Sequence, residues 1–128
     1  MTQEQFKTQY EYMSRNMIAL SERARREGLL ALEETLDKGA ISKRDPLQVG
    51  LQLVIDGTDA EIVTRVFDNI LEADCQAYGY ERILLKGIKT GVLSIQCGDN
   101  PRILKLLLDS VCPMEARPNF FSEREDDR

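Results

Sequence analysis

The chain has 128 residues, which is enough for one domain around one modest hydrophobic core. Its net charge of -5 and its pI of about 4.8 argue against binding to nucleic acid or anionic lipid, because phosphate contacts need clustered lysine and arginine side chains. Hydrophobic residues make up 42% of the chain, close to an ordinary globular composition, which excludes bulk disorder.

No stretch of the sequence approaches the roughly 18 apolar residues that indicate a membrane-spanning helix. The longest apolar stretches, Val49–Ile55 and Leu104–Leu108, are far shorter. The N-terminal residues are polar and lack the basic-then-apolar order of a signal peptide. We therefore expect a cytoplasmic protein without direct membrane insertion.

The N-terminal third of the chain predicts one long amphipathic helix. Its apolar residues recur at alternating steps of four and three: Phe6, Tyr10, Met13, Met17, Leu20 and Ala24. After Gly28 the apolar stripe continues through Leu29, Leu32 and Leu36. We predict a single helix over about residues 3–37, bent at Gly28 and ended by Lys38-Gly39.

Two helices follow in the middle of the chain. Asp45-Pro46 is typical of a helix start, with a capping carboxylate before a proline, and Asp56-Gly57 marks the end of that helix near Ile55. The sequence from Thr58 to Glu61 then predicts a capping box. A wide apolar stripe follows it: Ile62, Val63, Val66, Phe67, Ile70 and Leu71. A turn is expected at residues 78–80.

The C-terminal third predicts two more helices. The first, over about residues 82–96, carries Gly87 and Gly91 on one side, where a neighbouring helix can approach closely. Gly98 ends it, and Asn100-Pro101 begins a final helix that runs to Pro113. The short turn near residue 79 predicts that the helices at 61–73 and 82–96 pack antiparallel in one folding unit.

No segment alternates with a period of two for long enough to predict a sheet. The sequence therefore predicts an all-α, single-domain bundle of about five helices over residues 1–113. Six of the last seven residues, 122–128, are charged. We expect residues 114–128 to form a charged, disordered tail.

The chemistry-bearing residues do not predict an enzyme. There is no histidine, and no GxSxG elbow, P-loop or GxGxxG motif. The carboxylate pairs Glu33-Glu34 and Asp126-Asp127 fit solvated surface better than acid–base catalysis. Cys75, Cys97 and Cys112 form no CxxC pair, and reduced thiols explain them better than zinc does. We expect no metal and no cofactor.

Arg25 and Glu33 are eight residues apart. On a continuous helix they would lie about 12 Å apart along the axis and about 80° apart around it. Such a pair can meet a partner helix that carries the opposite charges. Periodicity alone, however, favours an ordinary solubilising helix surface.

Three ordered blocks of the sequence resemble the cytoplasmic parts of flagellar stator subunits of the MotA type. Residues 25–33, RREGLLALE, resemble the R-x-x-G-x-x-x-L-E core of that family's first cytoplasmic block. Residues 50–59, GLQLVIDGTD, resemble its GLQLVVDGTD block, and residues 86–102, KGIKTGVLSIQCGDNPR, resemble the signature of its cytoplasmic tail. The resemblance covers roughly residues 14–113.

The resemblance implies that residues 1–73 correspond to the family's loop between membrane helices two and three. Residues 82–113 correspond to its C-terminal tail. The few residues from Cys75 to Glu81 stand where the third and fourth membrane helices lie in the family. We therefore expect a MotA-like cytoplasmic helical domain without an ion path.

The resemblance also implies a partner. In the family, the residues matching Arg25 and Glu33 are the charged pair that faces the rotor switch protein, and Gly28 lies between them. We expect this chain to bind the rotor switch protein or another flagellar motor protein without conducting ions. We expect it in the cytoplasm, recruited to the inner face of the membrane at the motor. The sequence leaves open whether the chain forms a homo-oligomer.

Two alternatives remain open from the sequence. One is a general cytoplasmic helical adaptor that has kept the scaffold and lost the motor contacts. The other is an engineered fusion of two cytoplasmic stator segments. The joint DCQAYGYER lacks the glycine and serine bias of a made linker, which favours a natural protein.

Overall fold

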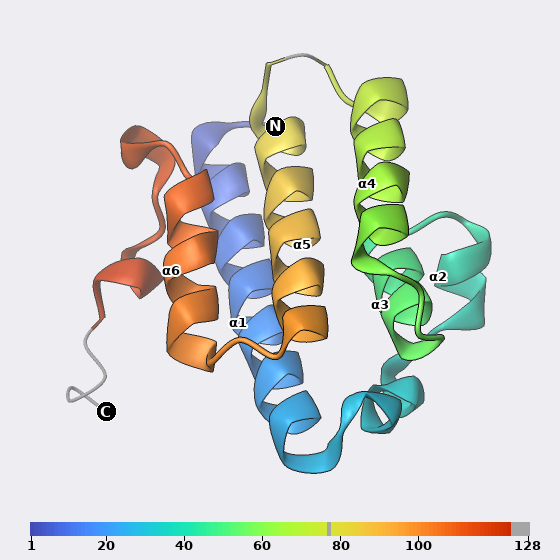
Figure 1. Cartoon of the computed structure of the whole chain (residues 1–128). Helices are drawn as coiled ribbons and strands as arrows, with labels where there is room; N and C mark the ends of the chain where they lie inside the picture. Colours follow the sequence, from blue (N-terminus) through green and yellow to red (C-terminus); the bar gives the residue numbers. More distant parts are fainter. Residues whose placement is uncertain (77, 124–128) are drawn as a thin grey trace.

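The computed structural model describes residues 1–76 and 78–123. All regular structure in these residues is helical, with no β-strand. The α-helices are α1 (Gln3–Glu27), α2 (Lys38–Ser42), α3 (Pro46–Ile55), α4 (Ala60–Asp74), α5 (Tyr80–Cys97) and α6 (Pro101–Val111). The 3-10 segments are η1 (Leu29–Thr35), η2 (Met114–Ala116) and η3 (Asn119–Ser122). The predicted all-α bundle with a long N-terminal helix is confirmed (Figure 1).

Helix α5 lies in the middle of the bundle and packs on α1, α3, α4 and α6. It runs antiparallel to α4 and to α6, as Figure 1 shows. The buried side chains form one cluster with members from both halves of the chain. The prediction that the two halves share one core, joined by a short turn between α4 and α5, is therefore confirmed.

The close approach of α1 to α5 depends on two glycines of α5. A Cβ atom built on Gly87 would lie 2.6 Å from the Tyr10 ring and 2.8 Å from the Met13 methyl group. A Cβ atom on Gly91 would lie 2.4 Å from Cγ of Met17. Side chains of α1 thus fill the space that a larger residue would need, and the predicted close packing at the two glycines is confirmed.

The first helix ends earlier than predicted. Helix α1 stops at Glu27, and Gly28 takes φ 91° and ψ 161°, a conformation that residues with a Cβ rarely adopt. The chain then continues as η1, which packs on α1 and α3 and buries Leu32 completely. The prediction of one helix over residues 3–37 is wrong, because burial of Leu32 against α3 requires a turn that a continuous helix cannot make.

Three of the predicted helix starts and ends are confirmed by the capping geometry. The Asp45 carboxylate accepts from Gln48 N, the Asn100 side chain accepts from Arg102 N, and Gly98 is left-handed at the end of α5. The prediction that Lys38-Gly39 ends a helix is wrong. Lys38 is the first residue of α2, and the Asp37 side chain caps that helix.

The predicted capping box at Thr58 and Glu61 is not formed. Helix α4 is preceded by Asp59, whose side chain makes no capping hydrogen bond. The backbone of Thr58 has another use: its carbonyl oxygen accepts from Nε2 of Gln96 at 2.6 Å. This contact with α5 fixes the α3–α4 turn, and it depends on a residue 38 positions away.

The segment at residues 114–123 is part of the fold, which corrects the predicted disordered tail at 114–128. Ala116, Phe120 and Phe121 are all buried. Arg117 anchors the segment through two contacts to the Asp109 carboxylate, at 2.5 and 3.1 Å. The charged composition of the C-terminal end outweighed two adjacent phenylalanines in the sequence-based prediction. Residues 124–128 lie outside the described residues.

A buried tyrosine and a half-buried thiol predict a loss of stability at alkaline pH. Tyr10 donates to the Leu108 carbonyl oxygen at 2.6 Å, and burial raises the pKa of Tyr10, with a further contribution from Cys112. Burial also raises the pKa of Cys112 from 9.0 to about 11. Between these values the unfolded chain holds fewer protons than the folded one, so the free energy of unfolding falls as pH rises.

We expect urea midpoints to be steady up to about pH 9 and to fall between about pH 9 and 11. Cys112→Ala should make that decline shallower while leaving the Tyr10 contribution. Titration of the same unfolding transition from pH 7 to 11 by circular dichroism measures both. A midpoint that rises with pH would contradict the assignment.

Candidate partner-binding surface

Three segments meet at one end of the bundle: the end of α1, the start of η1 and the α5–α6 turn (Figure 1). Arg25 in the last turn of α1 is exposed, and its Nη1 donates to the Gly98 carbonyl oxygen at 2.6 Å. Gly98 ends α5, where the helix dipole is negative and favours a cation. Arg25 therefore ties α1 to the α5–α6 turn while its side chain remains at the surface.

Glu33 does not stand in the predicted relation to Arg25. The continuous helix on which the 12 Å and 80° relation was based ends at Glu27, and Glu33 lies on η1 beyond the turn at Gly28. Glu33 is exposed, and its carboxylate has no partner among the described residues. Its neighbour Glu34 instead accepts from Arg23 at 2.8 Å, which holds η1 against α1. Glu33 is thus available to an outside group.

Gly28 shapes this surface through its backbone. A Cβ atom at Gly28 would meet nothing within 4 Å, so no neighbour excludes a larger residue there. The φ angle of 91° at Gly28 excludes a larger residue instead, because that backbone conformation is strained for any residue except glycine. Gly28 therefore sets the direction in which η1 leaves α1, and with it the position of Glu33 relative to Arg25.

Leu30 is a surface residue that the sequence analysis did not single out. It is 70% exposed, and it lies on η1 between Gly28 and Glu33. An exposed leucine among charged groups is a common composition for the centre of a binding surface. The signal in the sequence was its position off the stripe of Leu29, Leu32 and Leu36. We call Arg25, Gly28, Leu30 and Glu33 the charged end surface.

The three sequence blocks at residues 25–33, 50–59 and 86–102 are joined by two hydrogen bonds. Arg25 to Gly98 joins the first block to the third, and Gln96 to Thr58 joins the third to the second. Both bonds join residues far apart in the sequence. The blocks therefore form one continuous structure at this end of the bundle.

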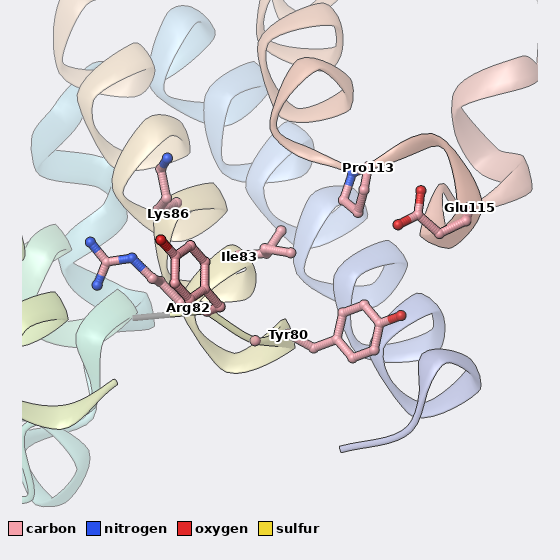
Figure 2. A pocket seen from close by; sticks show the side chains of 8 residues that line it. Tyr80, Arg82, Ile83, Lys86, Pro113 and Glu115 are labelled. Atoms are coloured by element: carbon pink, nitrogen blue, oxygen red, sulfur yellow. The ribbon is translucent and has the colours of Figure 1, made fainter. Parts of the chain in front are cut away.

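A separate groove of about 540 Å³ lies at the start of α5. Tyr78, Tyr80, Ile83 and Pro113 contribute to its walls. Arg82 and Lys86 extend on one side of Ile83, and Glu115 lies on the other side, beyond Pro113 (Figure 2).

The charged groups of this groove do not converge on one point. The Arg82 guanidinium donates to the Leu71 carbonyl oxygen at 3.3 Å, which directs it towards α4. The walls of the groove present mainly the apolar and aromatic side chains of Ile83, Pro113, Tyr78 and Tyr80.

Comparison of the chain with protein-family models, curated proteins and solved structures finds no match. Among residues 1–76 and 78–123, none of the helices combines the length and apolar character needed to cross a membrane. In the same residues no three of the side chains that commonly ligate metals gather into a group.

Proposed function

We propose that this chain is a MotA-like, flagellar motor-associated protein. It binds the rotor switch protein, or another motor component, through the charged end surface and does not conduct ions. Two observations support this proposal. Three sequence blocks resemble the stator family, and hydrogen bonds join those blocks at one end of the bundle. The observation that carries the proposal is the exposure of Arg25, Leu30 and Glu33 around a fixed turn.

The charges of this surface suggest the partner. A helix with an acidic residue facing Arg25, an apolar residue facing Leu30 and a basic residue facing Glu33 would complement it. Rim charges act mostly on the rate of encounter and on its salt dependence. The apolar contact at Leu30 would set how long the complex lasts.

A general helical adaptor is the second candidate, and one observation favours it. The bond from Arg25 to Gly98 gives Arg25 an intramolecular role, so its presence does not require a motor partner. Glu33 has no such role within the described residues. Binding by Glu33 variants therefore separates the two candidates better than binding by Arg25 variants.

Charge reversal tests the proposed function. We expect Arg25→Glu combined with Glu33→Lys to weaken binding to the purified rotor switch protein by about tenfold at low salt, because two favourable rim contacts become repulsive. Glu33→Lys alone should account for about half of the free-energy loss and leave the melting temperature unchanged. Arg25→Glu should also lower the melting temperature by a few degrees, since it places a carboxylate at the negative end of α5.

The matched control reverses another pair on α1. Glu4, which is exposed, and Lys7, which is half-buried, form an ion pair at 3.7 Å near the opposite end of that helix. Glu4→Lys with Lys7→Glu keeps the same net charge and should bind as the wild type does, in surface plasmon resonance at 50 and 300 mM salt. Equal binding by both double variants would remove the motor role and leave the adaptor as the better hypothesis.

A further inference from the structure

The groove at the start of α5 has uncompensated charges of opposite sign on its two sides. Lys86 lies on one side of Ile83, and Glu115 lies on the other side, beyond Pro113 (Figure 2). Both charged side chains are exposed, and neither the Lys86 ammonium nor the Glu115 carboxylate has a hydrogen-bond or ion-pair partner among the described residues. The wall between them is apolar. An occupant that complements the groove therefore carries an apolar group between an acid and a base.

Contacts within the chain hold the walls of the groove in place. The Tyr80 ring stacks on Phe6 with the ring centroids 4.9 Å apart. The Glu115 carbonyl oxygen accepts a hydrogen bond from the Gln3 side chain, which fixes the backbone of η2 and leaves the Glu115 carboxylate unused. Tyr78, which also lines the groove, is 90% exposed, so its ring is free to pack on an occupant. Preformed walls lower the ordering cost of binding.

The size of the groove and the placement of its charges favour a peptide segment over a small molecule. A volume of about 540 Å³ accommodates an aromatic side chain together with part of a peptide backbone. A free amino acid carries both of its charges on one carbon atom, so they cannot lie on opposite sides of its own ring. In an extended segment, side chains two positions apart point the same way and lie roughly 7 Å apart. An aromatic residue with an acid two positions to one side and a base two positions to the other therefore matches Lys86, the apolar wall and Glu115.

The chain's own version of this pattern is committed to its own fold. Among the described residues, the extended residue Leu36 has Glu34 two positions before it and Lys38 two positions after it. Leu36, however, packs against the hydrophobic core, and Glu34 is paired with Arg23 at 2.8 Å. The groove therefore matches a segment of another protein better than it matches a second copy of this chain.

We propose that the groove at the start of α5 binds an extended segment of another protein, in which an aromatic residue stands between an acidic and a basic residue. The aromatic ring lies against Tyr78 and Ile83, the acid faces Lys86, and the base faces the opposite side of the groove. This goes beyond the proposed function and does not depend on it. The charged end surface adjoins the other end of α5, 18 residues or about 27 Å away. The chain therefore has room for two partners at once.

Titration of the full chain with synthetic peptides, followed by NMR of the backbone amides, tests the proposal. The probes are acetylated and amidated Gly-Glu-Ser-Phe-Ser-Lys-Gly and Gly-Lys-Ser-Phe-Ser-Glu-Gly, which carry the same charges in opposite order. We expect the tighter of the two to bind with a Kd on the order of 0.1–1 mM and to shift the amides of Tyr80, Ile83 and Lys86, because a single buried ring supplies most of the affinity. Failure of both peptides to bind at about 5 mM, or shifts confined to another surface, overturns the proposal.

Two further probes separate the segment from its ring. Replacing the phenylalanine of the tighter peptide by alanine should weaken binding by at least about tenfold, because it removes the group that fills the groove. N-acetylphenylalanine amide has the ring without the two charges and should also bind at least about tenfold more weakly than the peptide. Equal affinity of that small compound overturns the peptide segment as the occupant.

A charge-exchange cycle tests the position of the acidic residue. Lys86→Glu should weaken the tighter peptide by about three- to fivefold, and a lysine in place of the peptide's glutamate should restore binding to that variant. Lys43→Glu makes the same charge change at an exposed lysine outside the groove and should bind as the wild type does. Equal losses for Lys86→Glu and Lys43→Glu would reflect net charge alone and overturn the proposal.

An exposed tyrosine tests the aromatic contact without disturbing the core. Tyr78→Ala should weaken the tighter peptide by about tenfold, because the exposed ring packs on the occupant. Tyr12→Ala, at a residue of α1 that is 74% exposed and outside the groove, is the control and should bind as the wild type does. Circular dichroism of each variant establishes that the chain is folded. Unchanged binding by Tyr78→Ala overturns the assignment of the groove.

Discussion

Replacing Gly87 by valine is expected to lower the free energy of unfolding by about 3 kcal/mol. That is a large share of the roughly 5–15 kcal/mol that keeps a domain folded. The cause is steric: a Cβ at Gly87 already lies 2.6 Å from the Tyr10 ring and 2.8 Å from its hydroxyl oxygen. The two further methyl groups of valine approach the same ring.

Tyr10 cannot easily move away from a larger residue at Gly87. It is fully buried, its hydroxyl donates to the Leu108 carbonyl oxygen, and its ring contacts Phe6 and Phe121 at centroid distances of 5.2 and 6.0 Å. Movement of Tyr10 would therefore disturb α6 and the C-terminal segment as well. The higher helix propensity of valine offsets only a few tenths of a kcal/mol.

The control for Gly87→Val is Lys86→Val, one position earlier on α5. Lys86 is exposed and has no hydrogen-bond or ion-pair partner among the described residues. We expect that variant to change the free energy of unfolding by less than about 0.5 kcal/mol. Urea denaturation followed by circular dichroism compares the two. Similar losses for both would mean that α1 and α5 do not pack through Gly87.

Helix starts and stops in this chain were predictable where the decisive contact is local. Asp45 and Asn100 each bond an amide within three residues, and the left-handed Gly98 ends its own helix. The break at Gly28 was not predictable in the same way. A glycine inside an apolar stripe is compatible with a bent helix or with an end, and only the packing of Leu32 under α3 decides between them.

The final helix shows a second limit of pattern-based prediction. Ile103, Leu104, Leu107, Leu108 and Val111 all fit one wide apolar stripe, and the sequence does not say which of them the bundle covers. The structure buries Leu104 and Leu108 and leaves Ile103 and Leu107 exposed. The side of α6 that is buried is decided by the helices that pack on it, which are α1 and α5. Which side of α6 stays exposed could not be recognised before those neighbours were placed.

The charged end surface was predictable only in part. Arg25, Gly28 and Glu33 came from a resemblance between sequences, and the structure places all three at or beside one turn. The bond from Arg25 to Gly98 spans 73 positions and has no local signal. Leu30 was hidden by its neighbours, because four leucines within eight residues look alike until Leu32 is seen to be the buried one.

Replacing Phe121 by alanine is expected to lower the free energy of unfolding by about 3 kcal/mol, at the lower end of the range for buried phenylalanines. Phe121 is 8% exposed, and its ring packs against Tyr10 and against Phe120. Its carbonyl oxygen accepts from Arg117 at 3.2 Å. Truncation leaves a cavity beside Tyr10, between α1 and α6, which the neighbouring side chains fill only in part.

The neighbouring Phe120 should behave differently from Phe121. Arg15 and Lys105 lie over its ring, at 4.3 and 4.6 Å from the centroid, so Phe120 joins α1 to α6 partly through cation–π contacts. Because the Phe120 ring is buried, added salt should weaken these cation–π contacts less than it weakens exposed ion pairs. Phe120→Leu keeps the apolar volume and removes the aromatic face, and it should cost about 1 kcal/mol.

Met114→Ala is the matched control for Phe121→Ala. Met114 belongs to the same C-terminal segment but is 79% exposed, so its loss should cost less than about 0.5 kcal/mol. Urea denaturation of the three proteins gives the comparison directly. A disordered segment would make both substitutions neutral, whereas a segment packed on α1 and α6 makes only Phe121→Ala severe. Amide hydrogen exchange at Tyr10 and Leu108 should then speed up in Phe121→Ala. The truncation removes the ring that packs on Tyr10, next to the hydrogen bond from the Tyr10 hydroxyl to the Leu108 carbonyl oxygen.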